Sequence, residues 1–214
     1  MKRFSGLNVN TAKKIMLDVG AFFINADPTQ GYKANVTAGR RVGATQGGGT
    51  FAANPETHYI HVDGMPENTK GMLVLDGWKP TLNLKMLEQD ATNVKRALGA
   101  ATSAAATLDE QSYQKISPKE EFEDGDYLSN VALATKIKGS NFPVWIVIYN
   151  AISFGGLSWN FTDKSETTSD VTFNAHYSVG EDDEISAPPF DIYIPDDVTE
   201  AQTQAAIDRA AVAE

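Results

Sequence analysis

The stretch VWIVIY (residues 144–149) is the longest strongly apolar run of the chain, and it sets the expectation for the fold. Large apolar side chains occupy its odd and even positions alike. Because successive side chains of a strand point to opposite faces, this run predicts a strand that is covered on both faces. The run is far shorter than the roughly 20 residues that a membrane-spanning helix requires. We therefore expect it to lie at the centre of a β fold.

Apolar and polar residues continue to alternate after this strand. GLSWNF (156–161) and VTFNAHY (171–177) each alternate, and a polar run separates them. Two such runs joined by a polar connection are typical of a β-hairpin with one buried face. The pattern therefore predicts that Trp159, Phe161 and Phe173 lie in the core.

Other short runs predict further strands. In TLNLKML (81–87), Leu82 and Leu84 would face one side of a half-buried strand, and Asn83 and Lys85 the other. Runs rich in β-branched and aromatic residues that end at turn signals complete the pattern. These are VGAFFI (19–24), THYIHV (57–62), YQKI (113–116), YLSNVALATK (127–136) and FDIYIP (190–195).

One helix is expected over residues 90–99. Asp90 fits the N-cap, where a side-chain oxygen accepts a hydrogen bond from a backbone N–H of the first turn. Val94 and Leu98 belong to an apolar stripe at helical spacing. Gly99 fits the position after the last turn, where helices often end in a left-handed conformation. The sequence therefore predicts a short helix with both ends capped.

Three further stretches are interpreted as connections. Residues 27–41 are polar and contain Pro28 and Gly39, which indicates a loop. Residues 63–71 (DGMPENTKG) form a second polar loop. Residues 100–108 (AATSAAATL) are small and weakly patterned, and we interpret them as a helix extension or a loop.

Together these elements predict a mainly β fold: a β-sandwich or partly open barrel of two packed sheets with one flanking α-helix. We expect one β domain over residues 17–195. An N-terminal arm (1–16) would precede it, and an acidic C-terminal tail (196–214) with a weak helical pattern would follow. The core candidates are Leu82, Leu84, Val94, Leu98, Ile146, Trp159, Phe161 and Phe173.

Charge is distributed unevenly along the chain, whose net charge is −10. Residues 1–14 carry basic residues and no acid, whereas residues 181–214 are strongly acidic. Such asymmetry is typical of interaction arms, and a pair of solvated termini is the simpler interpretation. The acidity argues against tight nucleic-acid binding, which requires clustered Lys and Arg. The candidate arm residues are Lys2, Arg3, Lys13, Lys14, Asp196 and Asp197.

GATQGGGT (43–50) nearly matches the phosphate-binding loop G-x-x-x-x-G-K-[ST], but Gly49 replaces the lysine. No buried strand precedes the run, and Pro55 and a β-rich segment follow it in place of a helix. We therefore interpret it as a turn at Gly47–Gly49 between an extended segment from about Val42 and one that continues from Phe51. One or more glycines should have a positive φ or contact a neighbouring chain. The candidate turn and assembly residues are Gly43, Gly47, Gly48 and Gly49.

No other motif predicts chemistry. The chain has no cysteine, which excludes thiolate metal ligands and disulfides. His58 and His61 would point to opposite faces of a strand, so they do not form a metal site by themselves. The acidic residues of KEEFEDGD (119–126) lack the order of a calcium-binding EF-hand. We therefore predict no enzyme activity, no catalytic residue, no metal and no cofactor.

Five stretches, in this order, resemble the major tail tube protein of long-tailed phages of Gram-positive bacteria. Their order and spacing carry the resemblance rather than any single motif. They are LDVGAFFIN (17–25), GATQGGGTF with HVDG (43–64), KGMLVLDGWKPTLNLKMLE (70–88), EDGDYLSNVALA (123–134) and GGLSWNFTDKSETTSDVTFNAHY (155–177).

The resemblance implies a structural virion protein, made in the host cytoplasm, that assembles into hexameric rings. Strands of neighbouring subunits would complete an inner β-barrel, and stacked rings would form a tube through which DNA passes without specific binding. A neighbouring subunit would then cover one face of the strand 144–149. The implied partners are further copies of the chain, the tape measure, the tail terminator and the distal tail protein. Loops 27–41 and 63–71 are candidates for contacts between rings.

Two alternatives remain open at this stage. Tube proteins of contractile tails and of phage-tail-like bacteriocins share the implied fold. A β-sandwich module of a virion that binds carbohydrate or a receptor would instead be a monomer with exposed aromatic residues, for which Trp78 and Trp159 are candidates.

Overall fold

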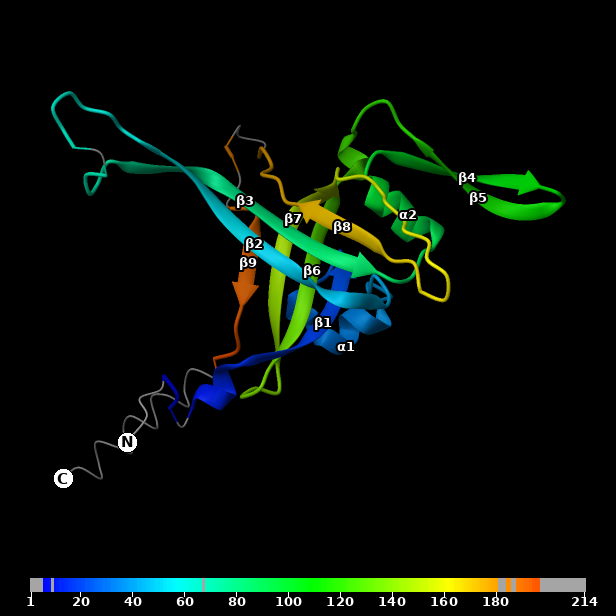
Figure 1. Cartoon of the computed structure of the whole chain (residues 1–214), viewed down its shortest axis with the longest axis horizontal. Coiled ribbons are helices and arrows are strands. Elements are labelled where there is room, and N and C mark those ends of the chain that lie inside the picture. Colours follow the sequence, from blue (N-terminus) through cyan, green and yellow to red (C-terminus); the bar gives the residue numbers. More distant parts are fainter. Residues whose placement is uncertain (1–5, 9, 67, 181–183, 186–187, 197–214) are drawn as a thin grey trace.

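The computed structural model describes residues 6–8, 10–66, 68–180, 184–185 and 188–196. It is mainly β, as expected, with two α-helices where one was predicted. Figure 1 shows the strands gathered in one body from which two hairpins project. The strands are β1 (Met16–Ile24), β2 (Thr45–Tyr59), β3 (Leu73–Met86), β4 (Ala101–Leu108), β5 (Gln111–Pro118), β6 (Leu128–Ile137), β7 (Pro143–Ser153), β8 (Ser169–Asn174) and β9 (Phe190–Tyr193). The α-helices are α1 (Gly31–Thr37) and α2 (Ala91–Leu98), and short 3-10 helices span Thr11–Lys14, Pro28–Gln30 and Asp124–Asp126.

Strand β7, which contains the stretch VWIVIY, joins the two halves of the main sheet. The strand order is β1-β6-β7-β8-β3-β2, and β9 pairs with β7 to complete seven strands. β7 pairs with β6 along most of its length, and with β8 only at Ile152 and Ser153. The expected two packed sheets are thus one seven-stranded sheet whose halves face each other. The other sheet is the hairpin β4-β5.

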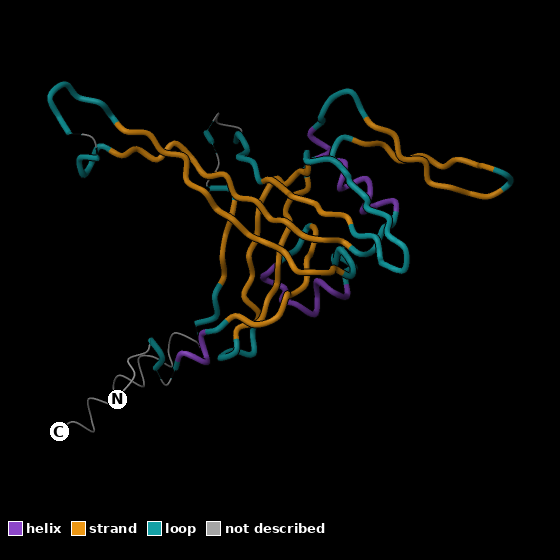
Figure 2. The backbone as a smooth tube through the Cα atoms, viewed as in Figure 1, coloured by secondary structure: helices purple, strands orange, loops and turns teal. Residues whose placement is uncertain are grey.

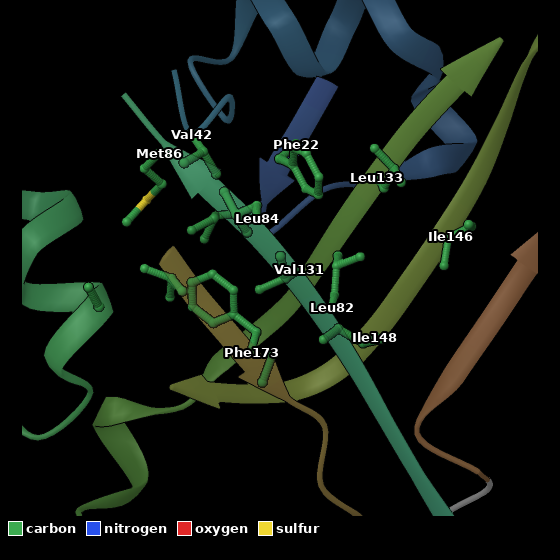
Figure 3. Packing of buried hydrophobic residues seen from close by; sticks show 14 residues of the cluster. Phe22, Val42, Leu82, Leu84, Met86, Val131, Leu133, Ile146, Ile148 and Phe173 are labelled. Carbon is green, nitrogen blue, oxygen red and sulfur yellow. The ribbon is translucent and has the colours of Figure 1, made fainter. Parts of the chain in front are cut away.

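The main core lies between the two halves of this sheet (Figure 3). The alternation predicted for residues 81–87 is confirmed, since Leu82 and Leu84 are fully buried. Of the other core candidates, Val94, Ile146 and Phe173 are also buried, and Leu98 is half-buried. The remaining members include Phe22, Val42, Met86, Val131, Leu133, Ile148 and Val171.

The opposite face of β7 is covered within the same chain. Trp145 packs on Phe23 of β1, with ring centroids 5.4 Å apart. Val36 of α1 packs against the same cluster, and Tyr32 of α1 makes an edge contact with Phe23. Burial of VWIVIY on both faces is therefore confirmed, but α1 supplies the cover that was expected from a neighbouring subunit.

The two end strands of the sheet approach each other, which gives a partly open barrel. Residues just before β2 pair with β1: Val42 N donates to Phe22 O at 3.0 Å, and Ile24 N donates to Arg40 O at 2.8 Å. These bonds join β1 to the residues before β2 and so close one end of the barrel. They lie at the end of β1 that is most buried. The rest of β1 has no strand partner beyond β6 among the described residues.

The stretch 27–41 was predicted as a loop, and this is wrong. It forms a 3-10 turn and α1, held by the fully buried Asn35. Asn35 Nδ2 donates to Asp27 O at 2.7 Å, and Asn35 Oδ1 accepts from Asp27 N at 2.8 Å. Pro28, which suggested a loop, occupies the start of the 3-10 turn, where proline is favoured at the first position. Helix α2 is confirmed: Asp90 accepts from Asn93 N at 2.6 Å, and Gly99 ends it at φ 71°.

The stretch 100–108 was predicted as a helix extension or a loop, which is also wrong. It is strand β4, paired with β5 in register from Ala101–Pro118 to Leu108–Gln111. A run of small residues has no periodicity of its own, so its partner strand decides its conformation. The candidate strand 113–116 is confirmed as part of β5.

The predicted hairpin of 156–161 and 171–177 does not form. β8 pairs with β3 along its whole length, and it pairs with β7 only at Phe173 and Asn174. Only a single bridge joins Trp159 to Ser169. Trp159 is 40% exposed and Phe161 is 77% exposed, so neither is the core residue that the alternation predicted.

Candidate assembly surfaces

The glycine run lies inside β2 rather than at a turn between two strands. β2 continues from Thr45 to Tyr59, and its pairing with β3 shifts register between Thr45 and Gly49. Gly47 (φ 85°) and Gly48 (φ 81°) are left-handed, which confirms the predicted positive φ. The predicted turn is therefore a β-bulge, in which extra residues bend the strand without ending it.

Gly49 serves the contact between β2 and the core. A Cβ atom there would overlap Asn83 O and lie 2.5 Å from Phe22 Cζ. Glycine is thus required because β2 passes directly over the Phe22 ring. Gly43 (φ 115°) lies beside the Glu88 carboxylate, whose Oε1 accepts a hydrogen bond from Ala44 N at 2.7 Å. These glycines shape the start of β2, and their predicted contact with a neighbouring chain stays a prediction.

The candidate arm residues lie partly in the described chain. Lys13 and Lys14 are exposed on the 3-10 helix Thr11–Lys14, and Asp196 is exposed as the last described residue. The predictions for Lys2, Arg3 and Asp197 fall outside the described residues.

Two β-hairpins project from the body (Figure 2). The first is the outer part of β2 and β3 with their connection, which contains the predicted loop 63–71. The second is β4-β5. Large apolar side chains are exposed on both, which is unusual for strands that face water on each side. They are Tyr59, Ile60, Val62, Leu73 and Leu75 on the first, and Leu108 and Tyr113 on the second.

Two strand edges of the main sheet also carry exposed apolar side chains. On β1 these are Met16, Leu17 and Val19, and on β9 they are Ile192 and Tyr193. Within the described residues, no strand pairs with the outer edge of either segment. An unpaired apolar edge is a template for pairing with another chain.

Groups suited to chemistry are not gathered in one place. In the part of the chain that the structure describes, no three His, Asp or Glu side chains lie together as metal ligands. His58 Nδ1 lies 2.7 Å from Asp76 Oδ1 on the exposed first hairpin, and His61 is further along the same hairpin. The acidic stretch 119–126 is used for a structural ion pair of Lys119 with Asp126 and Glu123.

Among the described residues, the surfaces that stand out are therefore the strand edges and the projecting hairpins, rather than a pocket lined by reactive groups. The sequence indicated the loop 63–71 but not the strand edges, because exposure of a strand edge depends on strand order. None of the described helices combines the length and apolar character needed to cross a membrane.

A scan against models of protein families finds no match to the chain, and a search of curated proteins finds no significantly similar sequence.

Proposed function

We propose that the chain is a self-assembling structural protein of a phage tail, whose hexameric rings stack into a hollow tube. The observation that carries the proposal is the pair of unpaired apolar edges on β1 and β9. Edge strands of monomeric proteins are normally protected by charge, proline or a covering element. Pairing of β1 or β9 with a neighbouring copy would remove this exposure and extend the sheet across subunits.

The two projecting hairpins support the same proposal. A protein that stays monomeric gains little from arms whose apolar side chains face solvent, whereas an assembling subunit uses them on its neighbours. The net charge of −10 supports a conduit for DNA, because a basic lumen would retain phosphates. In this assembly the chain would lie in the virion, with other tail proteins at the ends of the tube and inside it.

Electron microscopy of the purified chain over a range of concentrations tests the proposal. We expect rings or hollow filaments of constant diameter. Val19→Lys places a charge on the apolar edge of β1 and should abolish them, with the monomer still folded. Val179→Lys is the matched control, because Val179 is exposed but lies outside the named strands. A chain that remains monomeric at high concentration would overturn the proposal.

A carbohydrate-binding module of a virion is the second candidate, and one observation favours it. Trp159 and Phe161 are both exposed and stack edge to face, with centroids 6.3 Å apart. Exposed aromatic rings bind the apolar faces of sugars. Trp78, the other candidate, is half-buried against Phe190 and is less suited. Binding to a glycan array that is lost in Trp159→Ala, together with a monomeric state, would support this function over the tube.

A further inference from the structure

A groove lies on the outer surface between α1, β1 and β6. Its volume is about 770 Å³, a size that holds several side chains of a ligand. Lys33 and Tyr32 of α1 line one side, Lys136 of β6 lines another, and Phe142 and Asp18 complete the wall. The groove therefore combines aromatic surface with two ammonium groups and one carboxylate.

A bulge in β1 shapes this groove. The pairing of β1 with β6 shifts between Leu17 and Ala21, and Asp18 (φ 72°) and Gly20 (φ 76°) are left-handed there. Thr135 Oγ1 donates to Asp18 O at 3.1 Å and holds the bulge against β6. A side chain at Gly20 would overlap Ala134 O, so glycine lets β1 lie close to β6 beside the groove.

The positive groups of the groove have no acidic partner in the described chain. The ion pairs found there involve other residues, and neither Lys33 nor Lys136 takes part in one. Phe142 is 68% exposed beside them. An apolar surface flanked by two unpaired cations matches a ligand that carries both an apolar side chain and carboxylates.

The tip of the β4-β5 hairpin has this composition. Leu108 pairs with Gln111, so Asp109 and Glu110 form a two-residue turn, and both are left-handed (φ 49° and 61°). Such turns favour Asn-Gly or Asp-Gly, because most residues other than Gly, Asn and Asp adopt a left-handed conformation unfavourably. The chain thus places Glu110 where glycine would be more stable, next to the carboxylate of Asp109. Leu108 next to them is 61% exposed.

We propose that the tip Leu108–Asp109–Glu110 of one copy docks into the groove of a neighbouring copy. Asp109 and Glu110 would approach Lys33 and Lys136, and Leu108 would cover Phe142. Eight residues of β4 extend roughly 27 Å at about 3.4 Å per residue, which is long enough to reach past the surface of its own subunit. Figure 1 shows the tip of the hairpin directed away from the body.

This inference rests on the proposed self-assembly, and cross-linking tests it separately. Because the chain has no cysteine, every disulfide of Leu108→Cys with Phe142→Cys joins introduced thiols, and the two single variants show any links between like positions. We expect ladders of linked subunits on non-reducing gels of the assembled protein. Leu108→Cys with Phe154→Cys is the control, since Phe154 is exposed outside the groove.

Charge reversal provides the second test. Glu110→Lys should weaken association by about tenfold, the size expected for one interfacial ion pair, and Glu110→Lys with Lys136→Glu should restore it. Asp163→Lys, an exposed change outside the groove and the tip, should have no effect. Equal thermal melting of all variants shows that the fold is kept. If rings form but the 108–142 cross-link or the charge rescue is absent, the docking proposal is wrong and the proposed self-assembly stands. If the unmodified chain does not assemble, both proposals are wrong.

Discussion

Lys119 and Asp126 form an ion pair at the base of the β4-β5 hairpin, with Lys119 Nζ 2.8 Å from Asp126 Oδ1. The Asp126 side chain is only 2% exposed, and a second carboxylate, Glu123, also contacts the ammonium group at 2.6 Å. The ladder between the two strands also continues at this base, because Lys119 N donates to Ala100 O at 3.0 Å. The ion pair thereby connects the end of β5 to the 3-10 helix that precedes β6.

Asp126→Asn should loosen the hairpin without unfolding the core. The substitution removes the charge that holds Lys119 and leaves the strand pairing of β4 and β5 unchanged. Hydrogen exchange should rise in residues 101–118 and stay constant in β7. Glu123→Gln is the control, since Glu123 is 69% exposed and solvent screens its contribution. Equal exchange in both variants would mean that the pair does not anchor the hairpin.

The same ion pair predicts how stability depends on pH. Burial raises the pKa of Asp126, but hydrogen bonds from Lys119 Nζ and Glu123 N outweigh it and hold the pKa below its usual range. The hydrogen bond to Asp126 and then that to Glu123 raise the pKa of Lys119. The contribution of the pair is fully present above about pH 4, the ordinary aspartate value, and is lost as the pH falls through the lower folded pKa.

At alkaline pH the titration of Lys119 determines how the stability from this ion pair changes. The contribution of the pair is fully present below the ordinary lysine pKa of about 10.4 and is lost as the pH rises through the higher folded value. The difference in Tm between the natural chain and Asp126→Asn should therefore be constant from about pH 5 to 9 and shrink in stronger acid. A difference that persists unchanged at pH 2 would contradict this.

Gly49→Ala should destabilise the protein more than Gly47→Ala. The new methyl group at Gly49 would overlap the Phe22 ring and Asn83 O, and overpacking of this kind costs about 1–3 kcal/mol. At Gly47 there is room, since the nearest atom is Lys85 Cδ at 3.6 Å, and only the left-handed φ costs about 1 kcal/mol. Urea unfolding measures both. A larger loss for Gly47→Ala would show that the Phe22 contact relaxes.

Trp159→Ala should cost far less than a core substitution. Trp159 is largely outside the core, and its Nε1 donates to Ser169 Oγ at 2.7 Å and to Gln89 Oε1 at 3.0 Å. We expect a loss of about 1–2 kcal/mol from these hydrogen bonds and the partial burial. Phe173→Ala, at a fully buried position, should cost about 3–5 kcal/mol. Chemical denaturation measures the loss in free energy of unfolding for both variants. Equal losses would show that Trp159 contributes as much to packing as a core residue.

The central elements of the fold were predictable because their signals are local. The apolar run 144–149 and the alternation at Leu82 and Leu84 specify buried faces by composition alone. The caps at Asp90 and Gly99 specify the ends of α2 in the same way. In each case the side chains that carry the signal also make the stabilising contact.

Other elements could not be read from local pattern. The alternation in 156–161 is as regular as that in 81–87, yet among the described residues this segment meets β8 only in the single bridge of Trp159 with Ser169. The assembly surfaces could not be predicted from local pattern either. Nothing in Met16 or Val19 by itself indicates that no described strand pairs with that edge of β1. The groove similarly combines residues of β1 and α1 with residues of β6, which lies about 100 residues further along the chain.

The sequence by itself determined that the chain is mainly β, that VWIVIY lies at its centre and that the glycine run has left-handed residues. These follow from side-chain periodicity and from the conformational freedom of glycine, which act over a few residues. Only the tertiary structure decided that the run is a bulge over Phe22 and that α1 covers the outer face of β7. It also decided which edges remain unpaired, because strand order is set by the packing of the whole chain and not by any segment within it.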